Sequence, residues 1–195
     1  MNDLSTPGVQ RVVEAASRKG IALDIRLMPE SARTAEDAAA AFDAELGQIV
    51  KSLVFVAPRP EGRLLAIVCL VSGRNQVDLG YLAAGTGEVA IRAASAREAR
   101  ELTGYSAGGI PPFGFARDVR VVMDQDLAQY QWIWAAAGTE TAVLRVAPRV
   151  LRMLSNAIVA PIASTSWLQA AASQLEPAPG RAPLTYPEGQ YSWAP

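Results

Sequence analysis

The sequence contains no histidine among its 195 residues. Histidine is the most frequent general base in enzymes at neutral pH, and both the Ser-His-Asp and the Cys-His catalytic arrangements require it. Those mechanisms are therefore excluded within a single chain. An enzyme built on this sequence has to work with carboxylates, lysine, backbone amides, positioned water or groups of its own substrate.

Cysteine is almost as scarce, because Cys69 is the only one. A single cysteine excludes an internal disulfide and supplies too few ligands for a structural zinc site. We therefore expect a reducing compartment, no metal and no other cofactor. Cys69 lies in the apolar run 64–71, which favours a buried small hydrophobic residue, and a reactive nucleophile is the alternative.

Excess charge and long apolar runs are also missing. The 18 basic and 19 acidic residues leave a net charge of −1. Proteins that hold long stretches of nucleic acid are usually strongly basic, so we expect only a small, local nucleic-acid contact and no DNA partner. No apolar run reaches the roughly 18 residues of a membrane span, and residues 1–7 lack the features of a signal peptide. We expect a cytoplasmic protein without a membrane partner.

Hydrophobic periodicity and helix-capping patterns predict a mixed order of elements. Helices are expected at 7–20, 34–46, 77–85, 95–104 and from Pro148 onward, and strands at 22–27, 48–56, 63–71, 88–92, 119–123, 131–137 and 141–146. Helices interspersed with hairpin-linked strands favour an α+β fold over a doubly wound sheet. Five prolines after Ser166 predict an extended tail, so we divide the chain into a domain, 1–165, and a Pro-rich tail, 166–195.

Lysine is rare, and one of the two lysines lies in an unusual place. Sixteen of the 18 basic residues are arginine, and only Lys19 and Lys51 are lysine. Lys51 lies within the apolar run 48–56, where burying an ammonium group costs several kcal/mol unless a negative group meets it. Two interpretations are open. The lysine meets an anion, either a carboxylate of the chain or a phosphate-bearing ligand, or it lies on an edge strand with its head in water.

A loop rich in glycine and proline, 104–114, is the second unusual feature. Gly108 and Gly109 let the backbone approach a ligand closely, and Pro111 and Pro112 stiffen the chain that follows. Such a wall can hold an oxyanion or a carbonyl oxygen through its N–H groups. A rigid turn between a helix and a strand is the alternative, and composition alone favours it.

Several stretches, in this order, resemble the YbaK/ProX family of aminoacyl-tRNA deacylases, the stand-alone relatives of the editing domain in bacterial prolyl-tRNA synthetases. The stretches are 34–39, 48–55, 77–79, 102–105 with 108–114, 124–127 and 136–139. The resemblance covers roughly residues 8–160, and the order and spacing of the pieces carry it. It implies a mixed, mostly antiparallel, barrel-like sheet flanked by helices.

The resemblance also implies an activity, which is hydrolysis of the ester that links a wrong amino acid to the 3′ end of tRNA. The family's lysine lies at Lys51, where it would meet the acceptor-end nucleotide, and the family's G-x-x-x-P element is matched by Gly108 and Pro112. We therefore expect Lys51, Gly108 and Gly109 to be catalytic. The expected substrate-binding residues are Thr34, Ile110, Pro111, Pro112, Phe113 and Asp126.

The expected substrate carries a small amino acid, because Ile110, Pro111 and Pro112 would limit the size of the pocket. The acceptor end of aminoacyl-tRNA is the expected partner, and an aminoacyl-tRNA synthetase is a second candidate. Many relatives have a histidine where this chain has Phe115, and some have one in the segment aligned with 74–76. This departure keeps a non-catalytic module, which binds tRNA, a synthetase or an amino-acid-like ligand, as the alternative.

Acidic residues offer weaker candidates. Asp124 and Asp126 flank a turn and could bind a cation or act as a base, but capping of the short element after the strand is the favoured interpretation. Glu36 and Asp37 follow Thr34 in a capping-box pattern, so we expect them to serve the start of a helix.

Aromatic and arginine side chains near the second hairpin offer another candidate. Trp132 and Trp134 alternate with an isoleucine and therefore share one face of the predicted strand. They could stack on the terminal adenine, although packing in the core or against the tail is the favoured interpretation. Arg145, Arg149 and Arg152 lie near one helix and could contact tRNA phosphates, with a solvated face as the default.

Overall fold

The computed structural model describes residues 4–29, 32 and 34–165, so the predicted tail lies outside the described residues. Within them, the helices are α1 (Pro7–Ser17), α2 (Ala35–Ala41), α3 (Leu79–Thr86), α4 (Ala96–Thr103) and α5 (Pro148–Ser155). Three short 3-10 helices are η1 (Leu46–Gln48), η2 (Pro60–Gly62) and η3 (Gln125–Gln129). No helix in this part of the chain is long and apolar enough to cross a membrane.

The strands are β1 (Asp24–Leu27), β2 (Val50–Pro58), β3 (Leu64–Ser72), β4 (Asn75–Val77), β5 (Arg92–Ala93), β6 (Arg120–Asp124), β7 (Ile133–Thr139), β8 (Ala142–Val146), β9 (Ile158–Ala160) and β10 (Ala163–Thr165). They form three sheets with the strand orders β5-β2-β3-β6-β9, β1-β8-β7 and β10-β4. The pairs β3–β6 and β6–β9 are parallel, and the other ladders are antiparallel.

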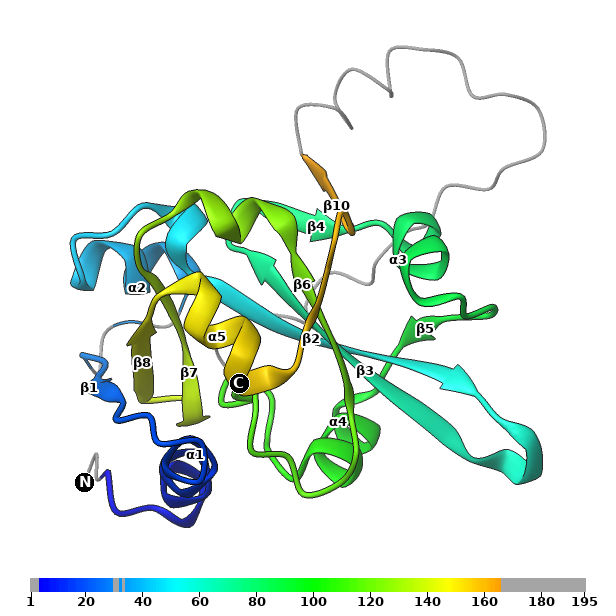
Figure 1. Ribbon diagram of the computed structural model, residues 1–195, viewed down its shortest axis with the longest axis horizontal. Helices are drawn as coiled ribbons and strands as arrows, with labels where there is room; N and C mark the ends of the chain where they lie inside the picture. The colour runs from blue at the N-terminus through cyan, green and yellow to red at the C-terminus, as the bar shows by residue number, and fades with distance from the viewer. Residues whose placement is uncertain (1–3, 30–31, 33, 166–195) are drawn as a thin grey trace.

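The five-stranded sheet is built around the long β2–β3 hairpin, which crosses the molecule diagonally in Figure 1. Both strands have nine residues and are rich in valine, isoleucine and leucine, which suit a sheet that is covered on both faces. The even-numbered residues Val50, Val54 and Val56 pack into the larger core, together with α1, α4 and α5. The odd-numbered Phe55 and Ala57 pack on the opposite face, against α3.

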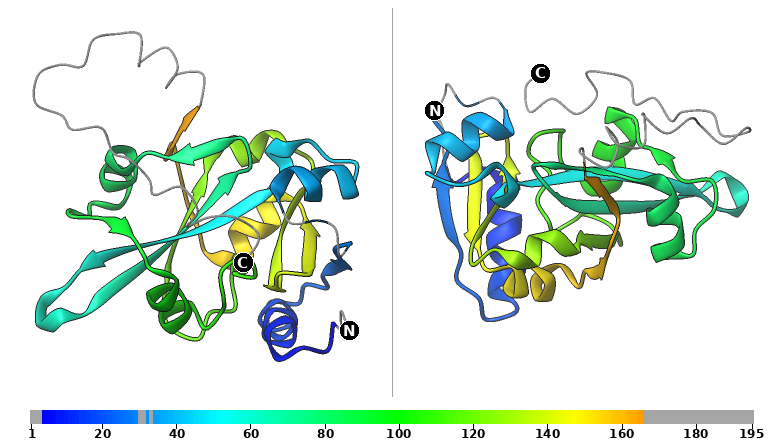
Figure 2. Two further views of the ribbon diagram at one scale, coloured as in Figure 1. Left: turned by 180° about the vertical axis from the view of Figure 1, so that it is seen from behind. Right: turned by 90° about the horizontal axis from the view of Figure 1, so that it is seen from above.

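The three-stranded sheet stands at one end of the molecule, as the view from above in Figure 2 shows. Trp134 of β7 and Val143 of β8 pack under the alanine-rich α2. Their neighbours Ala135 and Leu144 face the larger core with α1. This alternation is the period of two that a sheet buried on both faces requires.

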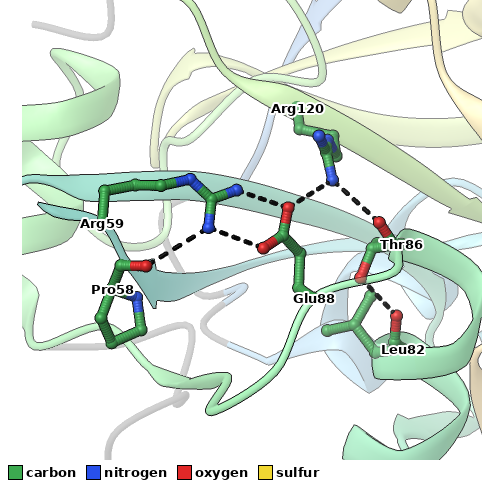
Figure 3. A network of polar contacts seen from close by, with 6 residues as sticks. All are labelled: Pro58, Arg59, Leu82, Thr86, Glu88 and Arg120. Atoms are coloured by element: carbon green, nitrogen blue, oxygen red, sulfur yellow. Dashed lines mark hydrogen bonds and ion pairs between the residues drawn. The ribbon is translucent and has the colours of Figure 1, made fainter.

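One buried carboxylate ties together three parts of the five-stranded sheet region (Figure 3). Glu88, in the loop after α3, accepts hydrogen bonds from Arg59 Nη1 and Nη2 at 2.7 and 2.5 Å, and Arg59 follows the end of β2. Arg120 Nη1, at the start of β6, lies 2.8 Å from Glu88 Oε1 and also donates to Thr86 O. The two guanidinium groups, Arg59 first, lower the pKa of Glu88.

The predicted α+β class is confirmed, but a closed barrel is not. Among the described residues the three sheets stay separate, and the one bridge between the two larger sheets joins Ile49 to Trp134. The helix expected at 34–46 ends at Ala41, and the strand expected at 88–92 is reduced to Arg92–Ala93. The sequence did not predict the short strands β4, β9 and β10, because each depends on a distant partner rather than on a local pattern.

Candidate functional site

Lys51 lies at the start of β2, where the strand pairs with β3 but not yet with β5. Its Nζ donates to the backbone carbonyl oxygen of Asn75 at 2.6 Å. Burial lowers the pKa of the Lys51 ammonium, and the charges of Glu36 and Asp124 oppose that shift. Lys51 makes no ion pair to a carboxylate within the described part of the chain. The Lys51 side chain is half-buried, and its ammonium group is held by a neutral acceptor.

Asn75, the residue that holds Lys51, is itself fixed by two carboxylates. The side chain is fully buried, and Nδ2 donates to Asp124 Oδ2 and to Asp126 Oδ2 at 2.8 Å each. Through Asn75 the structure brings Lys51 and Asp126, two of the predicted site residues, into one polar cluster on β2, β4, β6 and η3. Asn75 itself was not predicted, because its importance comes from burial that only the folded chain creates.

Asp124 is almost completely buried at the end of β6, and its oxygens are already in use. Oδ1 accepts from the N–H of Asp126 at 3.1 Å, and Oδ2 accepts from Asn75 and from the N–H of Ser72 at 3.3 Å. Burial raises the pKa of Asp124, and the hydrogen bond from Asn75 acts in the opposite direction. The predicted capping role is confirmed, since Asp124 is the N-cap of η3.

Thr34 begins α2, the helix that carries Glu36 near Lys51. Its Oγ1 accepts from the N–H of Asp37 at 3.1 Å, and Asp37 Oδ2 accepts from the N–H of Thr34 at 3.0 Å. This capping box confirms the predicted role of the acidic residues at this helix start. Thr34 is exposed, so a substrate contact of this residue stays a prediction alongside its capping role.

The loop 104–114 is held in one shape by its own contacts. Tyr105 donates its hydroxyl hydrogen to Gly114 O at 2.7 Å, which joins the two ends of the loop. Gly108 has a φ of 79°, a conformation that favours glycine, and a Cβ on Gly109 would lie 2.8 Å from the Cα of Thr139. The N–H of Gly109 donates to Ser106 O at 3.2 Å. Of the two glycine amides, that of Gly109 therefore already has an acceptor.

The buried residues of this loop belong to the larger core. Pro111 and Pro112 are buried, and Ile110 and Phe113 pack in the same core as Val50 and Val54 of β2. The Lys51 side chain leaves β2 on the other face, because side chains alternate along a strand. The lysine and the glycine loop thus approach the start of β2 from opposite sides.

Ser52 adds a polar group on the face of β2 that the loop covers. Its Oγ is buried and makes no hydrogen bond to any residue that the structure describes. Buried hydroxyl groups almost always have a partner, so Ser52 is a candidate contact for a substrate group. No sequence pattern identifies Ser52, because its hydroxyl group becomes informative only once the folded chain has buried it.

The two tryptophans differ in burial. Trp134 is 5% exposed and stacks on Phe42 with a centroid distance of 4.3 Å, which confirms the core interpretation for this residue. Trp132 lies just before β7 and is 38% exposed. The guanidinium of Arg145 lies 4.6 Å from the Trp132 ring centroid and 5.9 Å from that of Trp134, so both rings share one face as predicted.

Two further predictions concern cysteine and the missing histidines. Cys69 is fully buried, and burial raises its pKa, so the interpretation as a small hydrophobic residue is confirmed. At the position where many relatives have a histidine, the Phe115 side chain is partly buried and packs at the margin of the larger core. In the described part of the chain, no three His, Cys, Asp or Glu side chains come together as metal ligands.

Residues 29–154 match the sequence profile of a family described as "Aminoacyl-tRNA editing domain". The matched stretch contains Lys51, the Asn75 cluster and the loop 104–114. The chain belongs to the aminoacyl-tRNA editing domain family. The resemblance found in the sequence is thereby confirmed.

Three similar proteins are consistent with membership of this family. The chain is 30% identical to "Uncharacterized protein YwhH" of Bacillus subtilis over 68% of this chain and 81% of that protein. It is 31% identical to "Multifunctional Ser/Thr-tRNA deacylase ProXp-y" of Escherichia coli, over 59% of this chain and 68% of the relative. A crystal structure described as "a putative trans-editing enzyme for prolyl tRNA synthetase" is 42% identical, with a TM-score of 0.73 over 82% of this chain and 98% of the other. The predicted class, an aminoacyl-tRNA deacylase and therefore a hydrolase, agrees with the family and with these names.

Proposed function

We propose that this protein hydrolyses the ester bond of mischarged aminoacyl-tRNA that carries a small amino acid. Membership of the editing domain family and the names of the relatives support the reaction class. In this reaction water adds to the ester carbonyl carbon and the bond to the ribose oxygen breaks. The ribose oxygen takes up a proton, and the products are the free amino acid and the uncharged tRNA.

The state of Lys51 is the observation that carries the proposal. An ammonium group has three protons, and within the described residues only Asn75 O accepts one of them. Its charge is not neutralised by a carboxylate in an ion pair there, although burial makes such neutralisation favourable. A phosphate or a ribose oxygen of the acceptor end supplies the missing partner. Asn75 and Asp124 act as positioning residues, because they fix the carbonyl that holds the lysine.

The loop contributes shape and backbone donors. Gly108 is the stronger candidate to donate its N–H to the developing oxyanion, since the amide of Gly109 donates to Ser106 O. Ile110, Pro111 and Pro112 are buried and stiff, which limits the space for the amino-acid side chain to that of alanine, serine, cysteine or proline. Phe113 supports this wall from the core.

No histidine is needed for this chemistry. The ester is already an activated bond, and the neighbouring ribose hydroxyl and the amine of the amino acid are groups of the substrate that can assist the attacking water. The protein then holds the acceptor end, orients water and stabilises negative charge. Asp124 is not the base in this proposal, because both of its oxygens accept hydrogen bonds inside the protein.

The test is a deacylation assay with tRNAs charged with alanine, serine, cysteine or proline. The wild-type protein at micromolar concentration should release the amino acid from at least one of them. Lys51→Ala should slow this release by about 100-fold, the typical effect of removing one transition-state donor. Lys19→Ala is the matched control, because it removes the only other lysine, and it should retain the wild-type rate at a temperature where both variants are folded.

Two results would contradict the proposal. The role of Lys51 is refuted if a folded Lys51→Ala variant hydrolyses the substrates at the wild-type rate. The reaction itself is refuted if the wild-type protein binds these tRNAs but leaves every ester intact, which is the behaviour of a non-catalytic binding module.

A further inference from the structure

A groove opens on the molecule between the start of β7, α5 and the edge strand β9. The residues that line it include Tyr130, Trp132, Pro148, Arg149, Arg152 and Ile158. Trp132 is 38% exposed and Ile158 is 48% exposed. The groove therefore combines apolar surface, aromatic rings and two arginines on one face of the molecule.

One wall of the groove comes from a stretch of the chain with a local excess of positive charge. Residues 141–165 contain Arg145, Arg149 and Arg152 and no aspartate or glutamate, although the whole chain has a net charge of −1. Arg149 and Arg152 are exposed, and their spacing of three residues places them on one face of α5. Neither makes an ion pair with a carboxylate among the described residues. This local positive charge is complementary to a polyanion.

Trp132 gives the groove a second property that suits RNA. Its indole is partly exposed, and the guanidinium of Arg145 lies 4.6 Å from the ring centroid. Aromatic rings beside arginines are the usual surface on which nucleic-acid bases stack, since every base has a flat apolar face.

The groove lies on the α5 side of the five-stranded sheet, and one contact links its wall to the segment that leads into Lys51. Gln48 Nε2, in η1, donates to Trp132 O at 2.9 Å, and η1 leads directly into β2 and Lys51. At the same end, the guanidinium of Arg74 lies 5.8 Å from the ring centroid of Tyr130. An RNA strand whose 3′ end reaches Lys51 would have to pass round the end of the sheet at η1 to lie along α5.

We propose that this groove binds the acceptor arm of the tRNA substrate. Arg149 and Arg152 contact backbone phosphates, and Trp132 stacks on a base near the 3′ end. The inference rests on the proposed function for the identity of the RNA. The inference adds a second binding surface, which contacts the acceptor arm of the tRNA away from the ester bond that is hydrolysed.

The test measures binding of an acceptor-stem RNA minihelix without an amino acid, so that no ester is present. Fluorescence anisotropy at several salt concentrations gives both the Kd and its salt dependence. For Arg149→Gln with Arg152→Gln we expect a Kd about tenfold higher or more. The slope of log Kd against log salt should fall by roughly 1.4 to 1.8, because each lost phosphate contact contributes about 0.7 to 0.9.

Arg97→Gln with Arg100→Gln is the matched control. These two arginines are exposed, have the same spacing and lie on α4, where Glu98 and Glu101 are their neighbours. The control makes the same change in net charge, and it should leave the Kd within about twofold and the slope unchanged. Trp132→Leu is a second variant, and it should weaken binding without changing the salt slope, since it removes stacking and no charge.

The groove and the proposed function can fail separately. A short ester substrate, an aminoacylated CCA trinucleotide, is too small to reach along α5, so its hydrolysis should be equal in wild type and in the Arg149/Arg152 variant. If the two arginine pairs affect minihelix binding equally, or if the wild type does not bind the minihelix, the groove is not an RNA surface. A protein partner would then be the remaining occupant. Failure of the wild type to hydrolyse any ester substrate would instead overturn the proposed function.

Discussion

The two lysines of this chain differ in the number of acceptors that the protein gives them. Lys19 Nζ donates to Met153 O, Leu154 O and Asn156 Oδ1 at 2.7, 3.2 and 3.0 Å, so all of its protons are used at the C-terminal end of α5. Lys51 has one acceptor among the described residues. The protein therefore saturates the Lys19 ammonium, whereas the Lys51 ammonium keeps donors for the ligand that we propose.

The sequence could predict some of these residues and not others. Lys51 was identifiable because an ammonium group inside an apolar strand is unusual. The capping roles of Asp124 and Asp37 were predictable because they depend on residues two or three positions away. Asn75 and Ser52 were not predictable, since a buried amide or hydroxyl becomes informative only when the surrounding strands have paired.

Substitution of Thr34 tests whether a predicted site residue also stabilises the fold. Thr34→Ala should lower the free energy of unfolding by about 1 kcal/mol, because the N–H of Asp37 loses its acceptor. Thr34→Ser keeps the oxygen and should restore most of that stability. Urea denaturation at neutral pH measures both effects. An alanine variant as stable as the wild type would show that this cap does not stabilise α2.

At the scale of elements, long strands and capped helices were predictable and short strands were not. The β2–β3 hairpin has two nine-residue apolar strands, and the capping box at Ser95 begins α4 as expected. The strand β9 has three residues, two of them exposed, and it exists because β6 offers it a parallel partner. Such pairing joins residues more than 30 positions apart, which no local pattern records.

Glu88 links elements that are distant in sequence, and its charge should therefore contribute to stability. Glu88→Gln should lower the melting temperature at pH 7, because Arg59 and Arg120 lose their shared carboxylate. The folded protein has a lowered pKa for Glu88. Its contribution is therefore fully present above the ordinary glutamate pKa of about 4.3, and it is lost as the pH falls through the lowered value.

The measurement is a series of thermal melts of the wild-type protein and the Glu88→Gln variant between pH 7 and pH 3. The difference in melting temperature should shrink as the pH falls. Glu61→Gln is the control, since the Glu61 side chain is 82% exposed and lies 4.0 Å from Arg63, so its loss should change little. A Glu88→Gln variant that melts with the wild type at pH 7 would exclude a stabilising role for this network.

At the scale of the whole molecule, the fold separates the predicted site into two parts. The Lys51 cluster lies on one face of the five-stranded sheet, and the glycine loop packs into the core on the other. The resemblance implied a barrel-like sheet, whereas the described residues form separate sheets joined by the Ile49–Trp134 bridge. The proposed function requires the substrate to reach both parts at the start of β2, where successive side chains point to opposite faces of the sheet.

The most direct test of the central claim uses the scarcity of lysine. Protein labelled with ¹³C at lysine Cε should give two NMR signals, because only Lys19 and Lys51 are present. In the free protein Lys51 should titrate below the ordinary lysine pKa of 10.5. On saturation with a minihelix that carries an amide-linked, non-hydrolysable amino acid, the Lys51 signal should shift and its pKa should rise. A Lys51 signal that does not respond to saturating RNA, in a preparation that hydrolyses the ester substrate, would contradict the account.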